Sequence, residues 1–129
     1  MLENRDKKLI LSALAHTWIL DLDGTMVKHN GYKQDGRDTF LHGAEQFLKS
    51  IPQEDMIIFL TSRSKEYAQM TEKFLLEHGV RFDAVLYQVP YGERIVINDK
   101  KPSGLKTAVA RNVDRDADVN LEFHIRKSL

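Results

Sequence analysis

Cysteine is absent from this chain of 129 residues. Disulfide bonds, thiolate zinc sites and cysteine nucleophiles are therefore excluded, and nothing in the composition indicates an oxidising compartment. We expect a cytoplasmic protein. Tandem repeats, low-complexity tracts and linkers rich in proline, glycine or serine are lacking too, so we expect residues 1–129 to form a single domain.

An excess of charge of either sign is also lacking, because 19 basic residues balance 19 acidic ones. Nucleic-acid and anionic-membrane binders rely on excess positive charge, so we expect neither kind of partner. Long hydrophobic runs are missing as well. The apolar stretch "LILSALA" near the N-terminus is too short to span a bilayer, and we interpret residues 1–16 as a short helix lying on the domain. A small molecule is the favoured partner.

Four short apolar runs, rich in β-branched and aromatic residues, are present at 17–21, 56–60, 83–87 and 94–98. Such runs are typical of strands buried on both faces of a parallel sheet. Helical patterns separate them, one before Pro52 and one between Ser64 and Gly79. This alternation predicts an α/β fold, a three-layer Rossmann-like domain with a mostly parallel sheet. The alternating stretch "VNLEFHIR" predicts an edge strand, and we expect a C-terminal β-hairpin there.

Polar residues directly follow three of these strands, in "DLDGT", "TSR" and "NDKK". Ligands of open parallel sheets bind at the carboxyl ends of the strands, so these residues should meet at one edge. The first stretch resembles the start of a calcium-binding EF-hand loop, but Met26 and Tyr32 occupy the positions where that loop needs glycine and glutamate. The calcium interpretation therefore fails.

The pair Asp21 and Asp23 suits phosphoryl transfer instead. Asp21 can attack phosphorus as a nucleophile and form an aspartyl-phosphate. Asp23 lies on the same side of an extended chain and can protonate the leaving alkoxide, then deprotonate the attacking water. Gly24 allows a sharp turn whose N–H groups face phosphate oxygens. Because a phosphate ester repels carboxylates, we expect a bound Mg²⁺ to screen the encounter.

The other two strand ends supply candidate partners for the phosphate and the metal. Thr61 can donate a hydrogen bond to a phosphoryl oxygen, and Ser62 adds donors at the start of a helix. Arg63, taken alone, is interpreted as an ordinary surface residue. Asp99 follows the strand predicted at 94–98 and suits a Mg²⁺ site, because Mg²⁺ prefers hard oxygen ligands. The candidate cations for neutralising the phosphoryl group are Arg94, Lys100 and Lys101, and Asn98 could help through water.

Histidine occurs five times, with no pair at metal-ligand spacing on a helix. We interpret those at 16, 42, 78 and 124 as structural or exposed. His29 and Asn30 differ, because they belong to the polar loop "VKHNGYKQDG" that follows the aspartate pair and could fold over a substrate.

The motifs that follow the predicted strands, taken in this order, resemble those of the haloacid dehalogenase superfamily of phosphatases over about residues 16–105. "DLDGT" matches the first motif, "FLT" the second and "VIND" the fourth. The resemblance implies that Asp21 is the nucleophile, Asp23 the acid/base and Thr61 a phosphate-binding residue. It also implies that Asp99 binds Mg²⁺ together with Asp21 and the backbone carbonyl of Asp23. The third-motif lysine is not evident, and Arg94 or a lysine after Asp99 is the candidate substitute.

The stretches "VKHNGY", "FLTSR" and "GERIVINDKKPSG" look more narrowly like small phosphatase-like proteins of capsular or surface polysaccharide pathways. Residues 25–60 leave no room for a cap domain, so the site should be open. We expect a homo-oligomer that hydrolyses a sugar phosphate or small polyol phosphate. The alternatives are a catalytically impaired phosphate-binding or regulatory module, a polynucleotide phosphatase, and a receiver-like domain with a long-lived phospho-aspartate.

Overall fold

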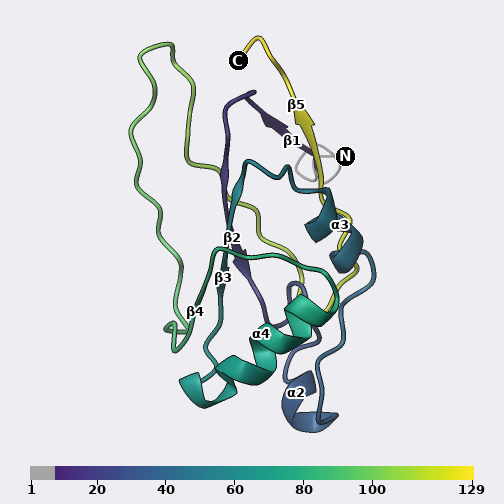
Figure 1. Ribbon diagram of the computed structural model, residues 1–129. Helices are drawn as coiled ribbons and strands as arrows, with labels where there is room; N and C mark the ends of the chain where they lie inside the picture. Colours follow the sequence, from purple (N-terminus) through teal and green to yellow (C-terminus); the bar gives the residue numbers. More distant parts are fainter. Residues whose placement is uncertain (1–7) are drawn as a thin grey trace.

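The computed structural model describes residues 8–129 and has an α/β fold with parallel strands (Figure 1). Two sheets are formed, one with two strands and one with three. The elements are β1 (Lys8–Leu11), β2 (Thr17–Asp21), α2 (Gly31–Gln34), α3 (Ala44–Ser50), β3 (Met56–Leu60), the 3₁₀ turn η1 (Lys65–Tyr67), α4 (Ala68–Glu77), β4 (Ala84–Leu86) and β5 (Glu122–Ile125).

The three-stranded sheet has the order β2-β3-β4, with all strands parallel. The strands expected at 17–21 and 56–60 are confirmed at those bounds, and β4 lies within the expected 83–87. Their register aligns Asp21 with Leu60 and Leu60 with Leu86, so the three strands end together. This shared end is the edge at which the sequence predicts the site.

Only one face of this sheet is well covered. Trp18, Ile57 and Phe59 point into a core that also contains residues of α3 and α4. On the opposite face Ile19 is 51% exposed and Leu86 is 50% exposed. The prediction that these strands are buried on both faces, as a three-layer domain requires, is therefore wrong for residues 8–129. Helices on a single face leave the other face open to solvent.

The two predicted helical segments form as expected, in slightly shorter lengths. α3 begins after Gly43, whose positive φ of 86° suits glycine, and ends before Pro52, which cannot continue a helix. The second segment is divided into η1 and α4, and ends at His78 just before Gly79. The short α2 was not anticipated, because four residues carry no readable helical period.

Both chain ends depart from the sequence-based expectation. Residues 8–11, assigned to a helix, form β1, and the remaining residues of that expected helix up to position 7 lie outside the described part. β5 confirms the expected edge strand, but it pairs in parallel with β1 instead of forming a hairpin. The ring of Phe123 packs against Trp18 at 5.2 Å between centroids. This contact attaches the small sheet to the main core.

Asp55, directly before β3, links the starts of β2 and β3 through hydrogen bonds. Its carboxylate accepts hydrogen bonds from the Trp18 indole and the His16 backbone N–H, both at 2.9 Å, and contacts the His16 ring. Burial alone would raise the pKa of Asp55, but these hydrogen bonds outweigh burial and hold the pKa below its usual 3.8. The ionised carboxylate therefore stabilises the folded state.

A long segment without regular secondary structure joins β4 to β5 and extends well beyond the sheet on one side (Figure 1). The strand predicted at 94–98 is not formed, and Ile95 and Ile97 are 80% and 91% exposed. A tight turn follows, in which Gly104 N–H donates to the Lys101 carbonyl. The β-branched composition favours a strand, but a strand also needs a neighbouring strand with which its backbone forms hydrogen bonds. Among residues 8–129, no strand pairs with residues 94–98.

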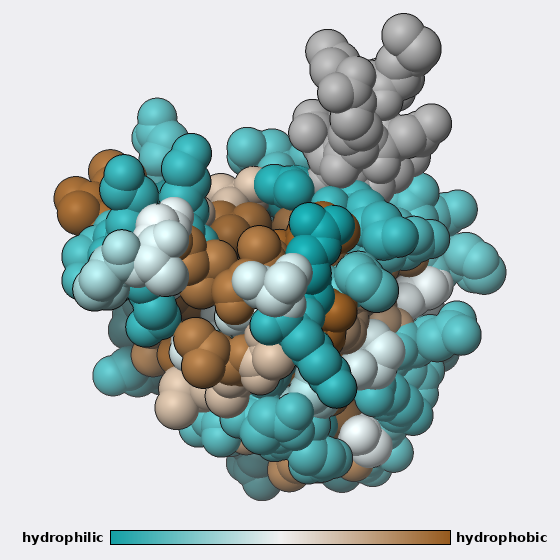
Figure 2. Space-filling model, turned by 90° about the horizontal axis from the view of Figure 1, so that it is seen from above, coloured by the Kyte–Doolittle hydropathy of each residue, from teal (hydrophilic) through white to brown (hydrophobic). Residues whose placement is uncertain are grey.

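Apolar surface is not confined to this segment. The end of the molecule opposite α2 shows a central apolar area bordered by hydrophilic residues (Figure 2). Among residues 8–129, no helix is both long enough and apolar enough to cross a membrane.

Candidate active site

The stretch "DLDGT" forms a compact turn at the carboxyl end of β2. Asp21 is the last residue of this strand, and the N–H of Leu22 still donates to the Leu60 carbonyl at 3.0 Å. Gly24 then adopts a φ of 80°, a conformation that other residues rarely tolerate. Its N–H donates to the Val27 carbonyl at 2.7 Å, which closes the turn. The predicted role of Gly24 in the chain reversal is confirmed, but its own N–H is engaged by Val27 and does not face a phosphate site here.

The carboxylate of Asp21 is partly accessible, with 35% of its side chain exposed. One oxygen accepts a hydrogen bond from the Thr25 hydroxyl at 2.8 Å, and the other contacts Arg94 Nη1 at 3.2 Å. Thr25 fixes the orientation of the carboxylate, and Arg94 places a positive charge beside it. An oriented carboxylate next to a cation is suited to meet an anionic electrophile.

Asp23 faces inward and both of its oxygens are engaged. Thr61 donates to one oxygen at 2.6 Å, and the Nε and Nη2 atoms of Arg63 donate to the other at 3.0 and 2.8 Å. Thr61 is fully buried at the end of β3. The Thr61 hydroxyl, predicted to bind phosphate, donates its hydrogen bond to Asp23.

Arg63 is the centre of a buried polar cluster, so its interpretation as a surface residue is wrong. It is only 3% exposed, and its guanidinium forms a two-pronged ion pair with Asp38 at 2.6 and 3.0 Å. It also donates to Thr71 and lies over the ring of Tyr32. Burial alone would lower the pKa of Arg63, but the hydrogen bonds to Asp38 and Asp23 outweigh burial and hold the pKa above its ordinary value.

A signal for Arg63 was present in the sequence. An inward carboxylate at one strand end needs a cation, and a neighbouring parallel strand that ends at the same edge is the nearest source. Arg63 is the first basic residue after β3. No comparable signal exists for Asp38, because it lies in a polar loop whose conformation the sequence does not specify.

Other expected site residues do not contact Asp21 or Asp23. Ser62 lies at this edge next to Thr61, but its hydroxyl donates to the Val89 carbonyl. Asp99 lies exposed in the long segment, where its carbonyl accepts from Thr107. Lys101 forms the turn that follows, and Lys100 and Asn98 are exposed beside it. The reason is the missing strand at 94–98: without it, nothing holds Asp99 at the carboxyl edge. Of the proposed cations, Arg94 alone contacts Asp21 or Asp23.

The predicted Mg²⁺ site is therefore incomplete in this arrangement. Within the described residues 8–129, no three side chains of the acidic, histidine or cysteine type converge to hold a metal ion. Mg²⁺ prefers several hard oxygen ligands in near-octahedral positions. Asp21 offers a suitable carboxylate oxygen. The ligand expected from Asp23 is its backbone carbonyl, because its carboxylate is paired with Arg63. The donor set present thus does not fit Mg²⁺ without the carboxylate of Asp99.

Residues 114–116, which the sequence analysis did not single out, lie against the "DLDGT" turn. The N–H of Asp116 donates to the Gly24 carbonyl at 2.8 Å, and its carboxylate accepts from the His29 N–H at 2.8 Å. The side chain of Arg115 passes Gly24 closely. Asp116 thus links the His29 loop to the "DLDGT" turn, while a contact of this loop with a substrate remains a prediction.

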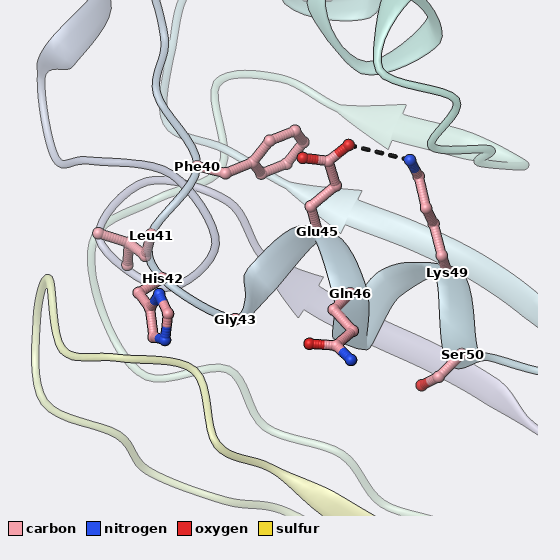
Figure 3. Close-up of a pocket in the computed structure, with 8 residues that line it drawn as sticks. All are labelled: Phe40, Leu41, His42, Gly43, Glu45, Gln46, Lys49 and Ser50. Atoms are coloured by element: carbon pink, nitrogen blue, oxygen red, sulfur yellow. Dashed lines mark hydrogen bonds and ion pairs between the residues drawn. The ribbon is translucent and has the colours of Figure 1, made fainter.

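A separate hollow of about 680 Å³ opens along α3 (Figure 3). Its one acidic lining residue, Glu45, points toward Lys49 and is bound to it at 2.9 Å. This hydrogen bond holds the pKa of Glu45 below its ordinary value. The hollow contains no pair of carboxylates and lies apart from Asp21 and Asp23 in the chain. Size alone does not make it a reaction site, because the chemistry needs reactive groups.

Comparison with known proteins returns no relative: no protein-family model, no curated protein and no solved structure matches the chain. The geometry and chemistry of the carboxyl-edge residues are therefore the basis for assigning a function.

Proposed function

We propose that the chain is a phosphomonoester hydrolase that works through an aspartyl-phosphate, with a capless fold of the haloacid dehalogenase type. The observation that carries the proposal is the carboxylate of Asp21, which is oriented by Thr25, accompanied by Arg94 and partly open to solvent. Cytoplasmic location, homo-oligomerisation and a sugar phosphate or small polyol phosphate substrate of surface polysaccharide synthesis belong to the same proposal.

In the proposed reaction, an oxygen of Asp21 attacks phosphorus while the bond from phosphorus to the leaving oxygen breaks. For Asp23 to give a proton to the departing alkoxide, it must first be protonated and release the hydrogen bonds that Thr61 and Arg63 donate to it. Arg94 offsets the charge on the phosphoryl oxygens. Water then attacks the phosphorus of the aspartyl-phosphate, Asp23 takes a proton from this water, and inorganic phosphate leaves. Two easier displacements thus replace one difficult one.

The requirement for Mg²⁺ is proposed from the order of the sequence motifs. Asp99 would have to leave its exposed position in the long segment to serve as a ligand. A bound Mg²⁺ would screen the repulsion between the ester and the carboxylates. Phosphate-binding roles for Ser62 and Lys101 rest on the same motifs.

The test is phosphate release from a panel of phosphorylated sugars and polyols, with Mg²⁺ and with a chelator. We expect release that needs Mg²⁺ and falls by on the order of 10³-fold or more in Asp21→Asn, since nucleophile removal has costs of this size. Asp35→Asn is the matched control, because Asp35 is an exposed carboxylate paired with Lys28. Undiminished activity in Asp21→Asn would refute the role of this carboxylate.

A second candidate, a catalytically impaired phosphate-binding module, is favoured by one observation. Both oxygens of Asp23 are held by Thr61 and Arg63, which leaves neither free for proton transfer. This candidate predicts that inorganic phosphate binds while no ester of the panel is hydrolysed.

A further inference from the structure

The long segment between β4 and β5 returns to the candidate site at both of its ends. Near its start, Arg94 contacts the Asp21 carboxylate at 3.2 Å. Near its end, Asp116 is hydrogen-bonded to the Gly24 carbonyl and to the His29 N–H. Each end therefore presents an arginine beside the "DLDGT" turn, Arg94 on one side and Arg115 on the other.

Arg115 lies directly over the turn. Its Cγ is 3.0 Å from the position that a Cβ on Gly24 would take, so the aliphatic stem of Arg115 packs closely on the turn. The residue as a whole is exposed. Among residues 8–129, the guanidinium has no hydrogen-bond or ion-pair partner, in contrast to Arg63 and Arg94, which are both bound to carboxylates. Arg115 thus offers five donors of a planar, permanently charged group next to the site.

A second polar group lies at the same place. The Nδ1 atom of His29 is buried and has no hydrogen-bond partner within the described part of the chain. The Cβ of His29 is 3.6 Å from the same Gly24 Cβ position, on which Arg115 also packs. Buried polar atoms normally have partners, so this unpaired ring nitrogen marks an unsatisfied polar group beside the turn on which Arg115 also packs.

We propose that Arg115 binds a second anionic group of the substrate, so that the preferred phosphomonoesters carry an additional carboxylate or phosphate. This inference rests on the proposed function, because it places the ester phosphate at Asp21.

Asp21 and the turn under Arg115 are close along the chain. Gly24 follows Asp21 by three residues, so their Cα atoms are at most about 11 Å apart. A phosphorylated sugar acid or a short bisphosphate is of comparable length. The guanidinium binds carboxylate and phosphate through the same two-pronged geometry, so both chemistries suit it.

The test compares substrates in pairs that differ by one anionic group. The carboxylate arm uses 3-phosphoglycerate against glycerol 3-phosphate, and 6-phosphogluconate against glucose 6-phosphate. The phosphate arm uses fructose 1,6-bisphosphate against fructose 6-phosphate. The measured quantity is the ratio of kcat/KM within each pair, for wild type, Arg115→Ala and Arg115→Lys.

We expect wild type to favour the more highly charged member in at least one arm by roughly tenfold, the size of one charge-assisted hydrogen bond at a partly solvated position. Arg115→Ala should bring this ratio close to one, and Arg115→Lys should restore part of it. Lys106→Ala is the control, because Lys106 is an exposed cation on the same segment without a contact to the turn. An equal loss in Lys106→Ala would mean that general charge attraction, not Arg115, sets the preference.

Failure of this inference differs from failure of the proposed function. If phosphate is released but the ratio does not change in Arg115→Ala, the second-anion site is refuted and the hydrolase stands. If no ester is hydrolysed, calorimetric titration of 3-phosphoglycerate and glycerol 3-phosphate decides the matter. Tighter binding of 3-phosphoglycerate that is lost in Arg115→Ala supports the site, and equal binding of the two compounds overturns it.

Discussion

Replacement of Asp38 by asparagine tests whether the buried cluster around Arg63 stabilises the fold. The side chains of Arg63 and Asp38 are 1% and 2% exposed, so the pair is withdrawn from water on both sides. Removing one partner of a buried ion pair leaves an uncompensated charge and costs about 3–5 kcal/mol. Arg63 would retain Asp23 and Thr71 as partners. We therefore expect Asp38→Asn to lower the free energy of unfolding by about 3 kcal/mol, the lower end of that range.

The assay is urea denaturation followed by the fluorescence of Trp18, the only tryptophan in the chain. With an m-value of about 1.5 kcal/mol per molar, a loss of about 3 kcal/mol shifts the midpoint by about 2 M. Asp35→Asn is the matched control, since it removes an equivalent charge from an exposed pair with Lys28. Exposed pairs contribute about 0.2–1 kcal/mol, so the control midpoint should move by less than about 0.7 M.

A small effect would contradict this reasoning. If Asp38→Asn and Asp35→Asn shift the midpoint equally, the Arg63 cluster is not buried in solution or is not coupled to folding. A changed m-value in Asp38→Asn would point to altered compactness instead of a lost ion pair, and a second variant, Asp38→Ala, then separates lost charge from lost shape.

Two further predictions concern stability alone. Asp55→Asn should destabilise the protein at pH 7 by about 1–3 kcal/mol, as expected for lost hydrogen bonds to a charged group. The pKa of Asp55 in the folded state lies below its usual 3.8. The stabilisation by the carboxylate is therefore fully present above pH 3.8 and is lost as the pH falls through the folded-state pKa. The difference in stability between wild type and Asp55→Asn should accordingly shrink in acid. Gly43→Ala should cost more than Gly36→Ala in thermal unfolding, although both positions have positive φ: a Cβ at Gly43 would overlap the Val119 carbonyl oxygen, whereas Gly36 has open space around it. An Asp55→Asn deficit that does not shrink as the pH falls below 3.8, or equal costs at the two glycines, would contradict these explanations.

The strands of the main sheet were predictable because their signal is local. Runs such as "TWILD" and "MIIFL" combine apolar, β-branched residues with polar ends, and β2 and β3 coincide with them. The same signal failed at 94–98, where an equally apolar run stays exposed. An apolar, β-branched composition indicates that a segment is suited to a strand, but it does not show whether a sheet edge is available for the segment to pair with.

The candidate site, like the sheet, was only partly predictable from the sequence. The placement of Asp21, Asp23 and Thr61 at one edge followed from the rule that parallel strands end together. Arg63 was misinterpreted because an arginine after a strand is usually solvated, and its burial depends on Asp38, 25 residues away in the chain. Asp116 and Arg115 were missed because residues distant in sequence share no local pattern with the turn that they contact.

The α/β class, the positions of β2, β3 and β4 along the chain, and the edge at which two aspartates meet a threonine can all be inferred from the sequence. These features depend on neighbours within a few residues, where periodicity and chain direction suffice. Three other features become visible only in the folded chain: the burial of Arg63 between Asp23 and Asp38, the pairing of β5 with β1, and the position of Arg115 over Gly24. Each of these contacts joins segments far apart in the chain, and their formation depends on how the whole chain packs.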